Sequence, residues 1–293
     1  MQDWLRRYYF TVGKAAAAVW NDAISYVGQI IALGPLWLTH RLTIETAFWA
    51  IAATSGLAFI LGAALERLRY AGEDIRDAWH RARGISIELG FSNQLQWLVY
   101  QGAMLIGASV AGPQAAGGVR ATQNVIGPVN IAFQTMENIV PIRAAEEMRR
   151  GGIHKAASFI FRFGAVGFVA LLLLFSAASL LSGRFLAFFY GHELRVYAGV
   201  LNLQMFYFLL AWPIRQLTFL FRTIESTRPI LLASVVAAVM SISVVYPMVK
   251  NYGALGIVLA SVAGQIGNLL YLAIAWTRVA ATAGAKQIST QPS

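Results

Sequence analysis

The chain contains a series of apolar runs, each close to the roughly 20 residues that an α-helix needs to cross a bilayer. The three clearest follow one another near the C-terminus, at 195–225, 228–250 and 252–276. Arg215 lies deep within the first of these runs. A charge at the centre of a spanning helix costs about 3 kcal/mol on insertion scales, so such a side chain normally faces protein or water. We therefore predict that Arg215 points into a hydrated cavity between helices.

The composition indicates an integral membrane protein that contacts membrane lipids. Hydrophobic residues make up 58% of the 293 residues and charged residues 12%, against about 45–50% and about 25% in soluble domains. Cysteine is absent, which excludes disulfides and thiolate zinc sites. The formal net charge of +10 comes from Lys and Arg in short joints between apolar runs. That distribution is typical of membrane orientation, and we expect no nucleic-acid partner.

The predicted fold class is all-α, a polytopic transmembrane helical bundle of about eight spans. With a cytoplasmic N-terminus, the inner joints hold about three times as many Lys and Arg residues as the outer joints, which follows the positive-inside rule. Both termini are therefore predicted to be cytoplasmic. The spans are predicted at 13–37, 43–65, 86–110, 120–141, 156–182, 195–225, 228–250 and 252–276.

Polar residues share one face of the helix in five of these spans, because positions that repeat at about 100° per residue align. Hydrocarbon cannot hydrogen-bond such side chains, so they must face water or other helices. Five such faces favour a hydrated cavity, and interhelical hydrogen bonding remains the alternative. The other three spans are expected at the periphery. The aligned residues are Asp22, Ser25 and Gln29; Asn93, Gln94, Gln96, Tyr100 and Gln101; Gln123, Asn130, Gln134 and Glu137; Gln204, Arg215 and Arg222; and Ser261, Gln265 and Asn268.

Individual charges in the spans allow two interpretations each. Arg215 could bind an anionic ligand or could pair with an acid such as Glu137. Asp22 and Glu137 could each hold a coupling ion or form a salt bridge. The sequence has no phosphate-binding loop, metal-spaced His/Asp/Glu cluster or nucleophile elbow. We therefore predict a protein that is not an enzyme and that has no cofactor and no metal site.

Four stretches resemble the polysaccharide and lipid-linked oligosaccharide flippases of the MOP (multidrug/oligosaccharidyl-lipid/polysaccharide) exporter superfamily. Each matches a joint or helix end of that family, in the family's order and spacing, and the match covers most of 86–278. The stretches are Gly107–Ala121, Glu137–Arg143, Phe189–Glu193 together with 203–229, and Tyr252–Ala260.

This resemblance implies a domain organisation. Members usually have twelve or fourteen helices in two six-helix lobes, so residues 86–279 would form the second lobe. Residues 1–85 would supply the last two helices of the first lobe and a cytoplasmic linker. At 66–84 both charge signs alternate with Leu68, Ile75 and Trp79, which predicts an amphipathic helix on the inner membrane surface, with a solvated charged linker as the alternative. Residues 280–293 are expected to form a disordered cytoplasmic tail. About four helices would be missing ahead of Met1, which makes a truncated product or a fragment the expectation.

The resemblance also implies a function, namely moving an undecaprenyl-diphosphate-linked oligosaccharide across the bacterial inner membrane by alternating access. Arg215 would bind the phosphates, with amides toward the sugar. One alternative is a cation-coupled multidrug antiporter that uses Asp22 and Glu137. Others are a lipid II flippase and a non-transporting fragment or scaffold of a glycan-assembly complex. The amides assigned to substrate are Gln94, Gln101, Gln123, Asn130 and Gln134.

Overall fold

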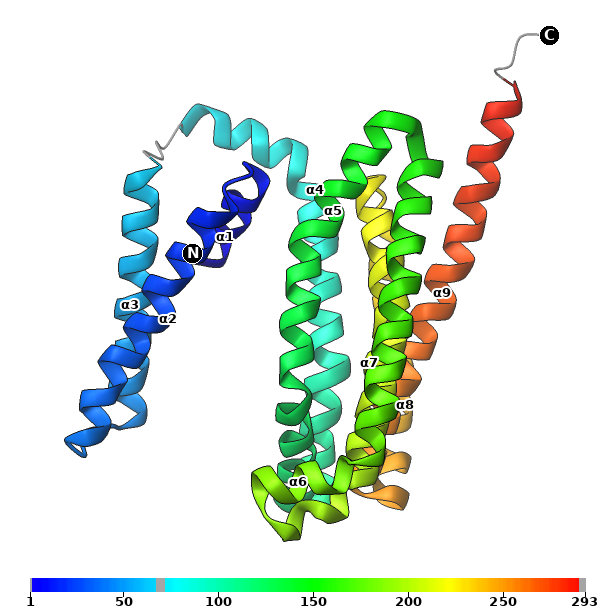
Figure 1. Ribbon diagram of the computed structural model, residues 1–293. Coiled ribbons are helices and arrows are strands. Elements are labelled where there is room, and N and C mark those ends of the chain that lie inside the picture. Colours follow the sequence, from blue (N-terminus) through cyan, green and yellow to red (C-terminus); the bar gives the residue numbers. More distant parts are fainter. Residues whose placement is uncertain (1, 67–71, 290–293) are drawn as a thin grey trace. The chain divides into compact units, whose positions relative to one another are not determined.

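The computed structural model describes residues 2–66 and 72–289, and within them the chain is helical with no strand. The prediction of an all-α helical bundle is confirmed. The elements are α1 Gln2–Thr11, α2 Ala15–Leu38, α3 Ile44–Leu65, α4 Gly72–Trp97, η1 Leu98–Gly102, α5 Ala103–Leu180, α6 Ser182–Tyr190, η2 His192–Tyr197, α7 Ala198–Thr223, α8 Arg228–Tyr252 and α9 Ala254–Ser289 (Figure 1).

Five helices of the described chain are long and apolar enough to cross a membrane, which makes this a multi-pass membrane protein. The longest, Ala82–Leu180, is broken where Gly112 and Gly152 have φ of 86° and 70°. Glycine adopts such values readily because it has no Cβ. The run therefore folds as three segments, 82–111, 113–150 and 153–180. The five runs that meet this length and composition are Ile44–Leu65, Ala82–Leu180, His192–Thr223, Arg228–Tyr252 and Ala254–Ala281.

The chain forms two compact units, 1–79 and 80–293, so the division falls six residues before the sequence-based boundary at 85/86. In the first unit, the buried Leu5 and Tyr9 of α1 pack against α2 and α3. The Tyr9 hydroxyl donates a hydrogen bond of 3.2 Å to the Gly62 carbonyl of α3. In the predicted linker, 67–71 lies outside the described residues, and 72–84 belongs to α4.

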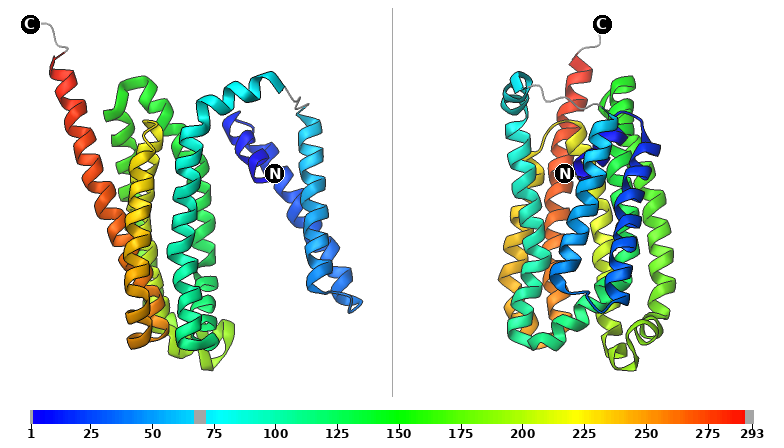
Figure 2. Two further views of the ribbon diagram at one scale, coloured as in Figure 1. Left: turned by 180° about the vertical axis from the view of Figure 1, so that it is seen from behind. Right: turned by 90° about the vertical axis from the view of Figure 1, so that its left-hand side faces the viewer.

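The second unit holds most of the buried apolar core, and α7 is central to it. Phe219, Leu220 and Phe221 of this helix are almost completely buried. Helix α7 contacts both α5 and α9, while α8 and α9 form the most extensive helix pair. Figures 1 and 2 show these helices running alongside one another, with α6 at the end of the unit where α5 ends and α7 begins.

Two expectations from the sequence are corrected here. The run 228–250, expected at the periphery, is α8, and its extensive contact with α9 buries Ala233, Ala237 and Ser241. The tail 280–293 was expected to be disordered, but α9 continues to Ser289. The remaining positions, 290–293, lie outside the described residues. The polar composition of the tail was a poor guide because a helix that is already formed extends at little cost.

Close packing of α8 on α9 predicts that Gly264 cannot be enlarged. A Cβ on Gly264 would lie 2.8 Å from the Ala237 carbonyl oxygen and 3.1 Å from the Ser241 Cβ. Because the backbone of α8 must shift to admit it, Gly264→Ala should lower the free energy of unfolding by about 1–3 kcal/mol. The change should appear as a lower melting temperature of the purified protein in detergent.

Gly127→Ala is the matched control, because a Cβ on Gly127 of α5 meets no heavy atom within 4 Å. Alanine is also the better helix former. This variant should melt at or above the parent temperature. Equal melting temperatures for the two variants would contradict the account of α8–α9 packing.

Candidate functional site

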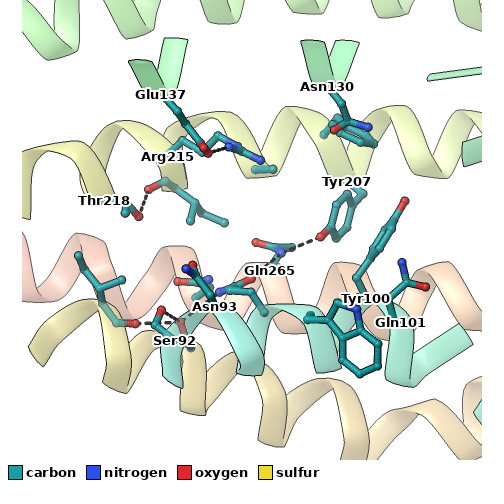
Figure 3. Close-up of a pocket in the computed structure, with 18 of the residues that line it drawn as sticks. Ser92, Asn93, Tyr100, Gln101, Asn130, Glu137, Tyr207, Arg215, Thr218 and Gln265 are labelled. Carbon is teal, nitrogen blue, oxygen red and sulfur yellow. Dashed lines mark hydrogen bonds and ion pairs between the residues drawn. The ribbon is translucent and has the colours of Figure 1, made fainter. Parts of the chain in front are cut away.

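A cavity of about 360 Å³ lies within the second unit, lined by residues of α4, η1, α5, α7, α8 and α9 (Figure 3). Most of its lining side chains are polar, although every contributing helix except the extended α4 is strongly apolar in composition. The polar lining residues are Ser92, Asn93, Gln96, Tyr100, Gln101, Asn130, Glu137, Tyr207, Arg215, Thr218, Arg222, Ser234, Gln265 and Asn268.

Hydrogen bonds link the amides and hydroxyls on one wall of the cavity. The Gln265 side-chain amide donates to the Tyr207 hydroxyl at 3.0 Å and to the side-chain oxygen Oε1 of Gln96 at 3.4 Å. The Gln96 amide in turn donates to the Ser234 hydroxyl at 3.3 Å, and the hydroxyls of Ser234 and Ser92 are 2.7 Å apart. Four helices, α4, α7, α8 and α9, are therefore joined through side chains that can also bind water or a ligand.

Arg215 of α7 forms an ion pair with Glu137 of α5, and both side chains line the cavity (Figure 3). The guanidinium also lies 4.7 Å from the ring centroid of Phe133, at cation–π distance. The two charged side chains are 32% and 36% exposed. Arginine has five N–H donors, so pairing with one carboxylate oxygen leaves donors for another acceptor. The structure thus shows the acid pairing that the sequence allowed, with the pair facing the cavity.

The π-helical turn η1 places Tyr100 and Gln101 on the cavity wall. In this turn the carbonyl of Val99 accepts hydrogen bonds from two hydroxyls, that of Ser241 on α8 at 3.4 Å and that of Ser261 on α9 at 3.3 Å. The Ser261 hydroxyl shares its proton with the Ile257 carbonyl of its own helix, also at 3.3 Å. A single π turn inside a helix shifts the register of its side chains, and such turns are frequent at functional sites. The two serines therefore hold the irregular turn against its neighbouring helices.

Four of the predicted site residues meet at this cavity, namely Arg215, Glu137, Asn130 and Gln101. Faces from four of the five polar spans contribute to its lining. In the fifth, Asp22 of α2 lies in the first unit, where it pairs with Arg6 at 2.9 Å.

Three of the amides assigned to substrate are not among the lining residues. Gln94 and Gln134 are exposed. Gln123 accepts a hydrogen bond of 3.0 Å from Arg120. Gln134 lies on α5 four residues after Asn130 and three before Glu137, so it shares their helix face without lining the cavity.

Four polar lining residues were not predicted from the sequence, namely Ser92, Tyr207, Thr218 and Ser234. Tyr207 and Thr218 are spaced eleven residues apart on α7, so they share a helix face, and Tyr207 lies eight residues before Arg215. That spacing could have identified them. Ser234 lies seven residues before Ser241 on α8, so the two serines share a helix face, and the packing of α8 brings Ser234 to Ser92.

No family model and no curated protein matches this chain. Solved structures do match. One is a multidrug resistance MATE family transporter of the MOP superfamily in its outward-facing conformation, with a TM-score of 0.70, 15% identity and 92% of this chain covered. A MOP superfamily transporter from Pyrococcus furiosus matches with a TM-score of 0.66, 16% identity and 92% coverage. A MATE protein in complex with MaL6 matches with a TM-score of 0.66, 17% identity and 94% coverage.

The chain has the fold of MOP superfamily transporters. It spans 64% of the length of each of these solved structures. The MOP fold is therefore present over nearly the whole of this chain, and the cavity lies within that matched fold.

Because Ser241 and Ser261 share the Val99 carbonyl as acceptor, we predict that the effects of replacing them on the unfolding free energy are not additive. Either Ser241→Ala or Ser261→Ala leaves one hydroxyl on the Val99 carbonyl, so each should lower the unfolding free energy by less than about 1 kcal/mol. The double variant removes both donors and should cost more than the sum of the single variants. A double-mutant cycle of thermal or denaturant unfolding measures the coupling.

Ser243→Ala on the same helix is the control, because its hydroxyl is exposed and bonds only within α8, to the Met240 carbonyl. Combined with Ser261→Ala, it should be additive. Strict additivity of Ser241→Ala with Ser261→Ala would show that the two hydroxyls do not act on one acceptor.

Proposed function

We propose that this chain belongs to a membrane transporter that moves a lipid-linked oligosaccharide or polysaccharide precursor across the bacterial inner membrane, with both termini cytoplasmic. The observation that carries the proposal is the cavity of about 360 Å³ lined by amides, hydroxyls and the Arg215–Glu137 pair within membrane-crossing helices. The MOP fold supports transport by alternating access.

The charges of the cavity favour an anionic substrate. Arg215 and Arg222 line it together with a single acid, Glu137. Guanidinium groups bind phosphate oxygens in a planar, bidentate geometry. The polar wall around Gln265 and Tyr207 offers donors and acceptors of the kind that sugar hydroxyls need. In a diphosphate with an attached glycan, the phosphates match the arginines of the lining and the sugars match its amides and hydroxyls.

Glu137 gives the site a way to bind and release such a substrate. In the structure the Glu137 carboxylate pairs with one nitrogen of the Arg215 guanidinium. An incoming phosphate therefore competes with the carboxylate for that cation. Substrate affinity would then depend on how readily the carboxylate is displaced from Arg215.

Two of the three amides that were assigned to substrate but do not line the cavity lie near residues that do. Gln134 is exposed on the same face of α5 as Asn130, and Gln94 adjoins Asn93 on α4. We place these amides toward a glycan that is larger than the cavity itself. Gln123 is already bonded to Arg120 and would have to exchange that partner.

A cation-coupled multidrug antiporter is the second candidate. The observation that favours it is the carboxylate of Glu137 in the cavity, because an acid in such a site can bind a proton or a cationic drug. One of the matched structures is described as a multidrug resistance transporter. The Pyrococcus furiosus transporter is described as having a binding pocket of reverse polarity, which suggests a different function for that protein. Pocket charge is therefore the property that separates the two candidates.

Opposite charge substitutions test the choice directly. Arg215→Gln should weaken binding of an undecaprenyl-diphosphate-linked oligosaccharide by roughly 10- to 100-fold, because a charge-assisted hydrogen bond is lost. Glu137→Gln should strengthen that binding, because the competing carboxylate is removed. Binding to the purified chain in detergent can be measured by microscale thermophoresis, with tetraphenylphosphonium as the cationic probe.

Arg149→Gln is the control, because Arg149 is an exposed basic residue of α5 outside the cavity lining. It should leave both affinities unchanged. Tight tetraphenylphosphonium binding that Glu137→Gln abolishes would select the antiporter. If neither probe binds to the parent chain or to either cavity variant, the cavity has no transport role. A scaffold in a glycan-assembly complex would then be the remaining hypothesis.

A further inference from the structure

A second pocket, about 280 Å³ in volume, lies apart from the central cavity, where α6 turns into η2. Three of its six lining residues carry basic side chains, and no acidic residue lines it. The central cavity shares none of its residues. The lining residues are Gly183, Arg184, Ala187, Phe188, His192 and Arg195.

The two arginines line the same pocket, and the small Gly183 lets one of them pack against α6. A Cβ on Gly183 would lie 3.2 Å from the Arg195 Cγ and 3.4 Å from its Nε, so the Arg195 side chain lies against the first turn of α6, next in sequence to Arg184. Neither arginine forms a salt bridge within the part of the chain that the structure describes. The nearby Glu193 lines a different pocket, together with Arg120.

Large apolar side chains project around this basic pocket. Phe188, which lines the pocket, is 82% exposed, and its neighbour Phe189 is 62% exposed. Leu186, on the opposite face of α6, is completely buried and anchors the helix to the bundle. Helix α6 lies at the level where the membrane-crossing run ending at Leu180 stops (Figures 1 and 2). Exposed aromatic residues beside basic ones at that level are typical of the membrane–water interface.

We propose that this pocket binds the phosphate of an anionic phospholipid, with Arg184 and Arg195 on the phosphate oxygens and the acyl chains along Phe188. Basic groups without acidic partners give the charge, and bidentate guanidinium geometry suits a phosphodiester. The exposed phenylalanines explain why the ligand is a lipid rather than a dissolved anion, since acyl chains cover them. This inference concerns lipid binding only and does not depend on the transported substrate.

The test compares lipid binding to the full chain and to a variant without the two charges. Native mass spectrometry of the delipidated protein should show phosphatidylglycerol binding about tenfold more tightly than zwitterionic phosphatidylcholine. Arg184→Gln with Arg195→Gln should weaken phosphatidylglycerol binding about 30-fold, on the scale of about 1 kcal/mol per basic residue near a membrane surface. Lys250→Gln is the control, an exposed basic residue in the last turn of α8 outside the pocket. It should change binding less than twofold.

A second variant tests the pocket without removing either charge, in case the double charge variant misfolds. Gly183→Val keeps both charges but places a side chain against Arg195, so it should also weaken phosphatidylglycerol binding while the melting temperature stays near that of the parent. Glycerol 3-phosphate, the soluble headgroup, should bind at least a hundredfold more weakly than the lipid. Unchanged phosphatidylglycerol affinity in the charge variant overturns the proposal. Equal affinity for glycerol 3-phosphate also overturns it and identifies a site for free anions.

Discussion

Hydrocarbon offers no hydrogen bonds, and this constraint organises the second unit of the chain. Each amide or hydroxyl on a membrane-crossing helix must find a partner in protein or water, because burying it unpaired costs several kcal/mol. Several helices meet that requirement by turning polar faces toward a shared space, whereas the buried side-chain amide of Gln216 on α7 has no hydrogen-bond partner among the described residues. Gln96, Ser234 and Gln265 bond to one another across α4, α8 and α9, and the same residues line the cavity. The groups that tie the bundle together are therefore also the ones available to a ligand.

The Arg215–Glu137 pair adds charge to this arrangement without isolating either ion. A lone guanidinium inside the bundle would carry a large desolvation cost, whereas a carboxylate opposite it offsets much of that cost. The Phe133 ring supports the cation from one side. Because both side chains remain about one-third exposed, a competing anion can reach the guanidinium. The Arg215–Glu137 pair can thus stabilise the bundle and also offer a binding group to a ligand.

Much of this could be predicted from the sequence, because length and apolarity determine the spans and helical spacing determines which face is polar. Arg215, Glu137, Asn130 and Gln101 reach the cavity as that reasoning requires. Gln134 and Gln94 do not, since a helix face is broader than the strip that borders a cavity. The π turn at η1 depends on contacts with distant helices, such as that from the Ser261 hydroxyl to the Val99 carbonyl, which no local pattern encodes. The helical extension of α9 beyond residue 279 likewise follows from the preceding helix rather than from its own composition.

Water access to the cavity is the claim on which the account depends, and a cysteine-free chain allows a direct measurement. A single cysteine at Ala211, which lines the cavity on α7, should react with a membrane-impermeant methanethiosulfonate reagent in reconstituted vesicles. A cysteine at Val239, an exposed apolar position in the middle of α8, should remain unreactive because lipid covers it. Comparable protection of both cysteines would show that the cavity is dry, and it would contradict the account.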